Sequence, residues 1–269
     1  MKGVLLELCP GATVVDISHE VPPHDVAHGA FVLDFASRHF PPEAVHVAVV
    51  DPGVGSDRRP LVVVTPDGVF VGPDNGLFGY VLERYHEDRT SESGEPGAPG
   101  TRRLFEPVTA SLPDACQAFV LDNPEFWLEP VSDTFHGRDI FAPVAGHLAN
   151  GVKPSYLGAR VYEVLTLWVP RPVRRGALVH GTVVYVDRFG NLVSNMRPAD
   201  FEAVEYVEVR GTRIEGPGHS YQDSPGPVTL VGSHGYLEIA FREGSAAERI
   251  DAKVGTEIVL SERGGPRTA

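Results

Sequence analysis

The fold is decided by the stretch Val45–Phe78, VHVAVVDPGVGSDRRPLVVVTPDGVFVGPDNGLF, which sets polar residues on two tight turns between apolar segments. VHVAVV (45–50) and LVVV (61–64) have the length and β-branched content of buried strands. DPG (51–53) and PDNG (73–76) are strong turn signals. Both turns therefore fall at strand ends, which is where α/β sheets bind ligands. We predict a functional site at these two turns.

Outward from this stretch, strand and helix patterns alternate. Thr13–Ile17 has the pattern of a strand, and the following segments carry apolar residues at helical spacing: Met1–Cys9, His28–Phe40, Leu77–Tyr85 and Phe141–Asn150. The alternation predicts an α/β class, with a Rossmann-like α/β/α domain around a central sheet. Residues 87–103 are rich in Ser, Gly, Pro and charges, so we expect a surface loop there without a chemical role.

The pattern changes after WVPRP (168–172), which is typical of a stiff linker. Short strands with Gly-rich turns follow, as in a small β-barrel or sandwich. The predicted strands are Leu178–Val186, Tyr206–Arg210, Val228–Val231, Tyr236–Ala240 and Glu257–Leu260. We predict an N-terminal α/β domain over residues 1–170 and a small C-terminal all-β barrel over residues 173–265.

Composition narrows the class of protein. The 269 residues carry a formal net charge of -13, which argues against a nucleic-acid partner because such proteins cluster Lys and Arg. Two cysteines are too few for a disulfide framework. We find no apolar run of membrane-spanning length and no signal-peptide pattern, so we expect a cytoplasmic enzyme without a membrane partner.

Three motifs carry possible chemistry. DPGVGSDRR (51–59) supplies Asp51 and Arg58, TFHGRD (134–139) supplies His136, and DRFGN (187–191) supplies Asp187 and Asn191. Each motif also has an ordinary structural interpretation: a turn before a strand, a loop histidine with an aspartate that caps the next helix, and a β-turn. Taken alone, none of the three decides between the two interpretations.

Together, DPGVG with its following Arg, GPDNGLF, FHGRDIFAP and DRFGNL resemble, in that order, the S-adenosyl-L-methionine (SAM) hydroxide adenosyltransferases, relatives of the SAM-dependent fluorinase and chlorinase. The resemblance runs from Met1 to about Leu260. It implies that water or hydroxide attacks the 5′ carbon of SAM and releases adenosine and L-methionine, with SAM as substrate and no cofactor or metal. It also implies a homotrimer whose active sites lie between the N-terminal domain of one subunit and the barrel of the next.

The resemblance carries a catalytic triad onto Asp51, Arg58 and His136. Methionine leaves a sulfonium as a neutral thioether, so the chemical difficulty lies in activating water. Histidine has an ordinary pKa of about 6.5, which suits His136 to accept a proton, with Asp51 orienting or sharing it. Arg58 stays protonated and would stabilise a hydroxide-like nucleophile.

The same comparison assigns substrate contacts. Asp187 and Ser233 match positions that hold the methionine amine and carboxylate, and Asn191 matches one that bonds the adenine. Asn75 is expected to line the pocket. An anionic aspartate facing an ammonium also makes electrostatic sense.

Four further residues complete the predicted substrate pocket. Phe135 and Gly137 flank the predicted catalytic histidine. Glu238 is expected to add a polar contact and Tyr221 to stack on the adenine, with plain surface exposure as an equal alternative for both.

Halide-binding relatives have tyrosine and serine where this chain has His136 and Gly137, and they lack the acid at Asp51. A carboxylate repels a halide, whereas water needs a group to take its proton, so we predict water as the nucleophile. A SAM-dependent halogenase and a non-catalytic SAM- or adenosine-binding module remain the alternatives. The module would keep Asp187, Asn191 and Ser233 without needing the histidine.

A nucleoside phosphorylase and a metal hydrolase are disfavoured, since we find no phosphate-binding loop and no zinc spacing around His136 and His147. Family members usually begin with a further strand and a Thr-Asp-Phe-Gly turn whose Asp is expected to bind the ribose. We expect either a start assigned too late or a chain with weaker ribose binding. An in-frame Asp-containing segment upstream would favour the first.

Overall fold

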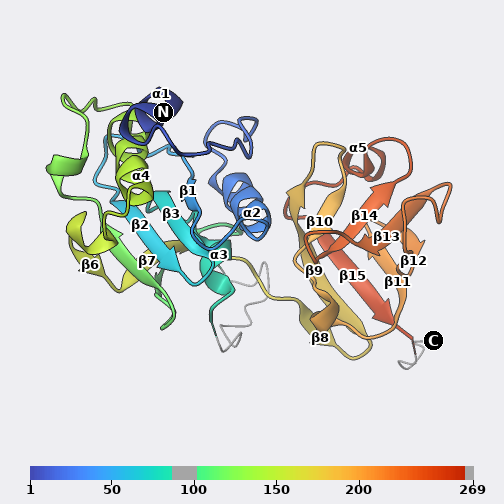
Figure 1. The fold of residues 1–269 in the computed structure, drawn as a ribbon. Helices are drawn as coiled ribbons and strands as arrows, with labels where there is room; N and C mark the ends of the chain where they lie inside the picture. Colours follow the sequence, from blue (N-terminus) through green and yellow to red (C-terminus); the bar gives the residue numbers. More distant parts are fainter. Residues whose placement is uncertain (87–101, 264–269) are drawn as a thin grey trace. The chain divides into compact units, whose positions relative to one another are not determined.

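The structure is a computed structural model that describes residues 1–86 and 102–263, and they form two compact units (Figure 1). The first unit holds residues 1–86 and 105–167, and the second holds 102–104 and 168–263. Most of the predicted 87–103 loop, residues 87–101, lies outside the described residues. The described part of the chain contains no helix long and apolar enough to cross a bilayer.

The first unit is built on a mixed five-stranded sheet. Its strands, in spatial order, are β1 (Val45–Val47), β3 (Gly68–Pro73), β2 (Pro60–Thr65), β5 (Gln117–Val120) and β6 (Arg160–Val161). β1 and β3 are parallel, and the other neighbours are antiparallel. A separate antiparallel pair joins β4 (Pro107–Ser111) to β7 (Glu163–Leu167). The predicted strands at 45–50 and 61–64 are confirmed, although the first is shorter than its apolar run.

Helices lie at all four predicted places, within slightly different bounds. They are α1 (Lys2–Leu8), α2 (Val26–Ser37), α3 (Gly79–Glu83) and α4 (Ala142–Ala149), the last preceded by a π-helical turn, η2 (Gly137–Phe141). Short 3-10 turns occupy η1 (Pro124–Phe126) and η3 (Pro154–Tyr156). The buried face of η2 and α4 packs with the sheet in one core of Val62, Val71, Phe119, Leu121, Ile140, Phe141, Val144 and Leu157.

The predicted strand Thr13–Ile17 is wrong. No strand is assigned to these residues, and Val14, Val15 and Ile17 are exposed. Alternation of apolar and polar residues produces a strand only where a neighbouring strand takes the backbone hydrogen bonds. Among the described residues, β1 has only β3 as a neighbour, so the 13–17 segment does not join that sheet.

The second unit is an antiparallel, nearly closed barrel-like sheet. Its strands are β8 (Val173–Arg175), β9 (Leu178–Val186), β10 (Leu192–Ser194), β11 (Val204–Val209), β12 (Thr212–Glu215), β13 (Pro227–Val231), β14 (Leu237–Phe241) and β15 (Glu257–Glu262). The order is β12-β11-β15-β9-β10-β14-β13, with β8 on β9. The edge strands β12 and β13 approach each other, since Thr229 Oγ1 donates to Glu215 O at 3.3 Å.

A core that includes Val183, Leu192, Leu237, Ile239 and Ile258 fills this second unit. Two short helical segments, η4 (Pro198–Asp200) and α5 (Ala246–Ile250), accompany the strands. All five predicted strands are confirmed in place, and the strands that prediction missed here, β8, β10 and β12, have three or four residues each. The α/β class with a C-terminal barrel is therefore confirmed.

Candidate active site

The strand order brings the two predicted turns together. β3 is hydrogen-bonded to β1 on one side and to β2 on the other. The chain from β1 to β2 must therefore cross the carboxyl end of β3, where the PDNG turn begins. This crossing carries residues 51–59, and the Asn75 amide donates to Val50 O at 2.8 Å.

Asp51 and Arg58 form a buried ion pair in this crossing. Arg58 Nε lies 2.9 Å and 3.0 Å from the two carboxylate oxygens, and the side chains of Arg58 and Asp51 are only 8% and 5% exposed. Ser56 folds the loop back by donating to Gly53 O and accepting from Arg58 N. Gly55 has φ +76, and a Cβ there would lie 2.5 Å from the carbonyl of Asp133, so glycine allows the loop to touch the segment before His136.

His136 is the third member of the cluster. Its Nδ1 lies 2.9 Å from Arg58 Nη2. A guanidinium can only donate, so Nδ1 must be the acceptor and the proton of the neutral ring sits on Nε2. Burial, and then the charge of Arg58, lower the pKa of His136 below its usual value. The ring is therefore neutral at pH 7. Its lone pair faces Arg58, so this contact does not favour His136 as proton acceptor, and that role stays a prediction.

Local structure holds the histidine in place. Asp139 accepts from Ser132 N at 2.9 Å and from Arg138 Nε at 2.6 Å, and the bond to Arg138 is the main reason that its pKa is lowered. Asp139 thus closes the loop around His136 instead of capping a helix. The ring of Phe141 lies 5.3 Å from the Arg58 guanidinium carbon, a cation–π distance.

Three other residues predicted for the substrate pocket also lie in the first unit. Asn75 uses its side chain on the backbone, since it donates to Val50 O and accepts from Leu77 N at 3.3 Å. Phe135 is 47% exposed, and Gly137 is buried at the start of η2. The sequence did not single out Asp74 and Arg59 as site residues, although both belong to the quoted motifs.

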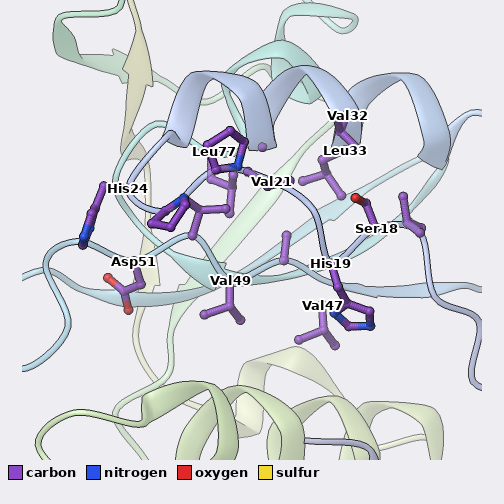
Figure 2. Close-up of a pocket in the computed structure, with 16 residues that line it drawn as sticks. Ser18, His19, Val21, His24, Val32, Leu33, Val47, Val49, Asp51 and Leu77 are labelled. Atoms are coloured by element: carbon purple, nitrogen blue, oxygen red, sulfur yellow. The ribbon is translucent and has the colours of Figure 1, made fainter. Parts of the chain in front are cut away.

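A cavity of about 410 Å³ adjoins Asp51. Its walls come from α2, the 17–24 segment and the β1 strand with its extension to residue 50. Figure 2 shows Asp51 and His24 at one end and Ser18 and His19 at the other, with Val47 beside His19 and Val49 between the two ends. Most of the lining is apolar, and the volume is typical of small-molecule sites.

In the second unit, Asp187 and Asn191 close the turn between β9 and β10. Asp187 accepts from the backbone N of Phe189 and Asn191 and from Asn191 Nδ2, each at 2.9 Å. Gly190 has φ +82, which the turn requires. The ordinary β-turn interpretation of this motif is therefore realised, and it leaves Asp187 half-buried with its charge fixed beside the turn.

Glu238, Tyr221 and His234 form a second polar group in this unit. Tyr221 Oη donates to Glu238 Oε1 at 3.0 Å. His234 Nδ1 accepts from Tyr236 N at 3.2 Å, so its Nε2 carries the proton that Glu238 Oε2 accepts at 2.9 Å.

Burial, and next the charge of Glu238, raise the pKa of Tyr221 to about 12, with a smaller contribution from Asp187. Ser233 is exposed in the turn before β14. Prediction missed His234, for which the only signal was a His four residues before a Glu. Within the described residues, no three His, Cys, Asp or Glu side chains are placed to hold a metal ion.

Comparison with known proteins finds matches to both units of the chain. A model of the SAM hydroxide adenosyltransferase N-terminal domain matches residues 1–99 and 102–158, and one of the C-terminal domain matches residues 181–259. The (R)-S-adenosyl-L-methionine hydrolase of Thermus thermophilus is 37% identical, over 97% of this chain and 92% of that protein. The hydrolase of the same name from Salinispora arenicola is 34% identical, over 95% and 89%.

The chain is also similar to more distant relatives and to a solved structure. The fluorinase of an Actinoplanes species is 24% identical, over 97% of this chain and 91% of its own length. The crystal structure of an uncharacterised conserved protein from Thermotoga maritima superposes with a TM-score of 0.79 at 32% identity, covering 97% of this chain and 93% of that one. The chain belongs to the SAM hydroxide adenosyltransferase family.

Proposed function

We propose that this protein hydrolyses SAM to adenosine and L-methionine by attack of water on the 5′ carbon. The observation that carries the proposal is the buried cluster of Asp51, Arg58 and His136 beside a cavity of small-molecule size. Relatives that share more than a third of their residues bear the name of (R)-SAM hydrolase. We propose the same epimer as substrate.

The cluster supplies what the reaction needs. The water oxygen bonds to C5′ as the C5′–S bond breaks, and that electron pair stays on sulfur as the neutral thioether of methionine. The proton of water goes to Asp51, whose oxygens keep free lone pairs besides those that face Arg58. His136 Nε2–H and the Arg58 charge stabilise the hydroxide-like oxygen. Asp51 therefore takes the proton-accepting role that the sequence analysis gave mainly to the histidine.

The second unit offers anionic groups to a cationic substrate. Glu238 is 3% exposed. It accepts hydrogen bonds from the Tyr221 hydroxyl and from the His234 ring, and neither of these donors is a cation that would neutralise the carboxylate. Asp187 and Glu238 both act electrostatically on Tyr221. We propose that these carboxylates hold the methionine ammonium, that Ser233 binds its carboxylate, and that Tyr221 and Asn191 face the adenine.

We further propose a cytoplasmic homotrimer in which one copy supplies Asp51, Arg58 and His136 and the next supplies Asp187. Sedimentation equilibrium measures the number of copies. Asp51→Ala and Asp187→Ala chains, each impaired by itself, recover part of the lost activity when they are unfolded and refolded together if the site is shared. Activity that stays absent in refolded mixed assemblies contradicts sharing.

The function itself is tested by chromatography of SAM incubated with the protein in ¹⁸O-labelled water. We expect adenosine and methionine in equal amounts, with the label in the 5′ hydroxyl of adenosine. If SAM binds but no product forms over hours, the result would instead support the non-catalytic SAM- or adenosine-binding module. A 5′-halogenated nucleoside formed in the presence of chloride would support the halogenase.

A further inference from the structure

The loop that carries Asp51 and Arg58 is held at both of its ends by one turn. We define the catalytic loop as residues 51–59 and the PDNG turn as residues 73–76. Because β3 lies between β1 and β2, the PDNG turn at the end of β3 sits between the residue that enters the catalytic loop and the residue that leaves it.

Asn75 holds the entering end. Its Nδ2 donates to Val50 O at 2.8 Å, and its Oδ1 accepts from Leu77 N at 3.3 Å. The second bond fixes the amide orientation, so that the first is always directed at the peptide before Asp51. Because β1 ends at Val47, Val50 lies beyond the strand, and the bond from Asn75 ties its carbonyl to the PDNG turn.

Asp74 holds the leaving end. Its backbone N donates to Arg59 O at 2.9 Å, and its Oδ2 accepts from Arg59 Nε at 2.9 Å. Its other oxygen accepts from Leu165 N on β7 at 2.8 Å, which anchors the carboxylate to a strand outside the loop. The side chain of Asp74 is 3% exposed, so this is a buried charge that Arg59 neutralises.

Between these two anchors, two backbone hydrogen bonds add to the Ser56 bonds and the Asp51–Arg58 pair described above. Val54 N reaches Asp51 O at 3.3 Å and Ser56 N reaches Gly53 O at 3.1 Å. Pro52, Gly55 and Ser56 are exposed. The place that the Asp51–Arg58 pair occupies in the site therefore depends on where the two ends of the loop are fixed.

We infer that Asp74 and Asn75 are positioning residues for SAM hydrolysis, which set the geometry of the Asp51–Arg58 pair from both ends of the catalytic loop. The inference rests on the proposed function. Asn75 then acts through Val50 and the residue that follows it, and its role of lining the substrate pocket stays a prediction. A displacement of about 1 Å is enough to slow a positioned reaction about 10²-fold.

Two isosteric variants and one control test this. Asn75→Asp replaces the donor to Val50 O with an oxygen, and Asp74→Asn removes the charge that pairs with Arg59. The control is Asp34→Asn, because Asp34 is also 3% exposed in the first unit and pairs with Arg84 and Arg38 away from the loop. We expect kcat to fall about 10- to 100-fold in both test variants with KM within about threefold. The control should lower the melting temperature but keep kcat.

A double-mutant cycle separates positioning from plain destabilisation. In an Asp51→Ala background, Asn75→Asp should lower kcat no further, because the group through which it acts is gone. Equal fractional losses with and without Asp51 would overturn the inference, and so would wild-type kcat in both test variants.

Hydrogen exchange of backbone amides can be measured without turnover. It therefore tests the positioning role of Asp74 and Asn75 separately from the proposed hydrolysis of SAM. The amides of Val54 and Ser56 should exchange faster in both test variants than in the wild type, and at the wild-type rate in Asp34→Asn. Unchanged exchange in the test variants overturns the positioning role. A wild-type protein that forms no adenosine but shows the exchange pattern would refute the proposed function and leave the anchoring of the loop supported.

Discussion

Replacing His136 with glutamine and, separately, with asparagine tests its two ring nitrogens one at a time. The glutamine amide nitrogen reaches the position of Nε2 and keeps a donor there, but it cannot accept a proton. The asparagine oxygen reaches the position of Nδ1, where it accepts from Arg58 Nη2 as the ring does at 2.9 Å. Arg58 fixes the ring proton on Nε2, so the nucleophile should depend on a donor at that position. We therefore expect glutamine, which keeps this donor, to preserve activity, and asparagine, which does not, to lose it.

The magnitude follows from the loss of one preorganised donor in a half-buried site. Such a loss typically costs about 10²–10³ in kcat, or roughly 3–4 kcal/mol of transition-state stabilisation. We expect kcat to fall by that factor in His136→Asn and in His136→Ala. In His136→Gln, kcat should stay within about tenfold of the wild-type value. Initial rates of adenosine release at saturating SAM measure all three. A glutamine variant as slow as the alanine variant would refute the donor role and restore the histidine as proton acceptor.

The pH profile gives a second test of the same assignment. Protonation would place a hydrogen on Nδ1, against the Arg58 donor. Since the pKa of His136 is lowered from 6.5, mainly by burial and then by Arg58, activity should hold through pH 6.5 and fall only below it. His136→Gln should lack that part of the acid limb. A nitrogen-15 spectrum of the labelled wild type should show a protonated Nε2 and an unprotonated Nδ1 at pH 7.

Three further predictions concern other groups. Arg58→Lys should lower kcat about 10²-fold, because the single nitrogen of an ammonium cannot occupy both the Nε position that bonds Asp51 and the Nη2 position that bonds His136 Nδ1. A rate within threefold of wild type would contradict that geometry. Glu238→Gln should raise KM for SAM about tenfold or more with a smaller change in kcat, and an unchanged KM would remove the carboxylate from substrate binding. Burial lowers the pKa of His28, His46, His136 and His147 below 6.5, so the unfolded chain takes up protons first as the pH drops. The free energy of unfolding in urea should therefore be insensitive to these groups above pH 6.5 and decline below it, and equal values at pH 7.5 and 5.5 would contradict this.

The local signals in the sequence were sufficient where a segment is long and periodic. The nine-residue β9 was predicted with its true ends, because its apolar run is bounded by clear turn residues. β3 was missed although it is central to the first sheet. Its sequence GVFVGP contains two glycines and a proline, and intrinsic preference disfavours a strand there until neighbours on both sides supply the pairing.

The site divides along the same line. Asp51, Arg58 and His136 were singled out from motifs. The structure brings them into contact, although Arg58 and His136 are 78 positions apart in the sequence. The assignment of roles needed the contacts themselves. The side chain of Asn75 bonds the backbone, since a short amide at a turn is often used on nearby peptide groups, and its place in the pocket stays a prediction. The trimer and the substrate contacts of the second unit stay predictions.

By itself, the sequence determined the class of fold through apolar periodicity and turn chemistry, which are local properties that a single chain displays. The family and the identity of the three clustered side chains came from four motifs that resemble, in their order, those of a known family. Only the tertiary structure decided which ring nitrogen of His136 carries the proton and what holds the catalytic loop. Both depend on hydrogen bonds between residues from separate strands and turns, and their direction is set by the donor or acceptor that the fold places within about 3 Å.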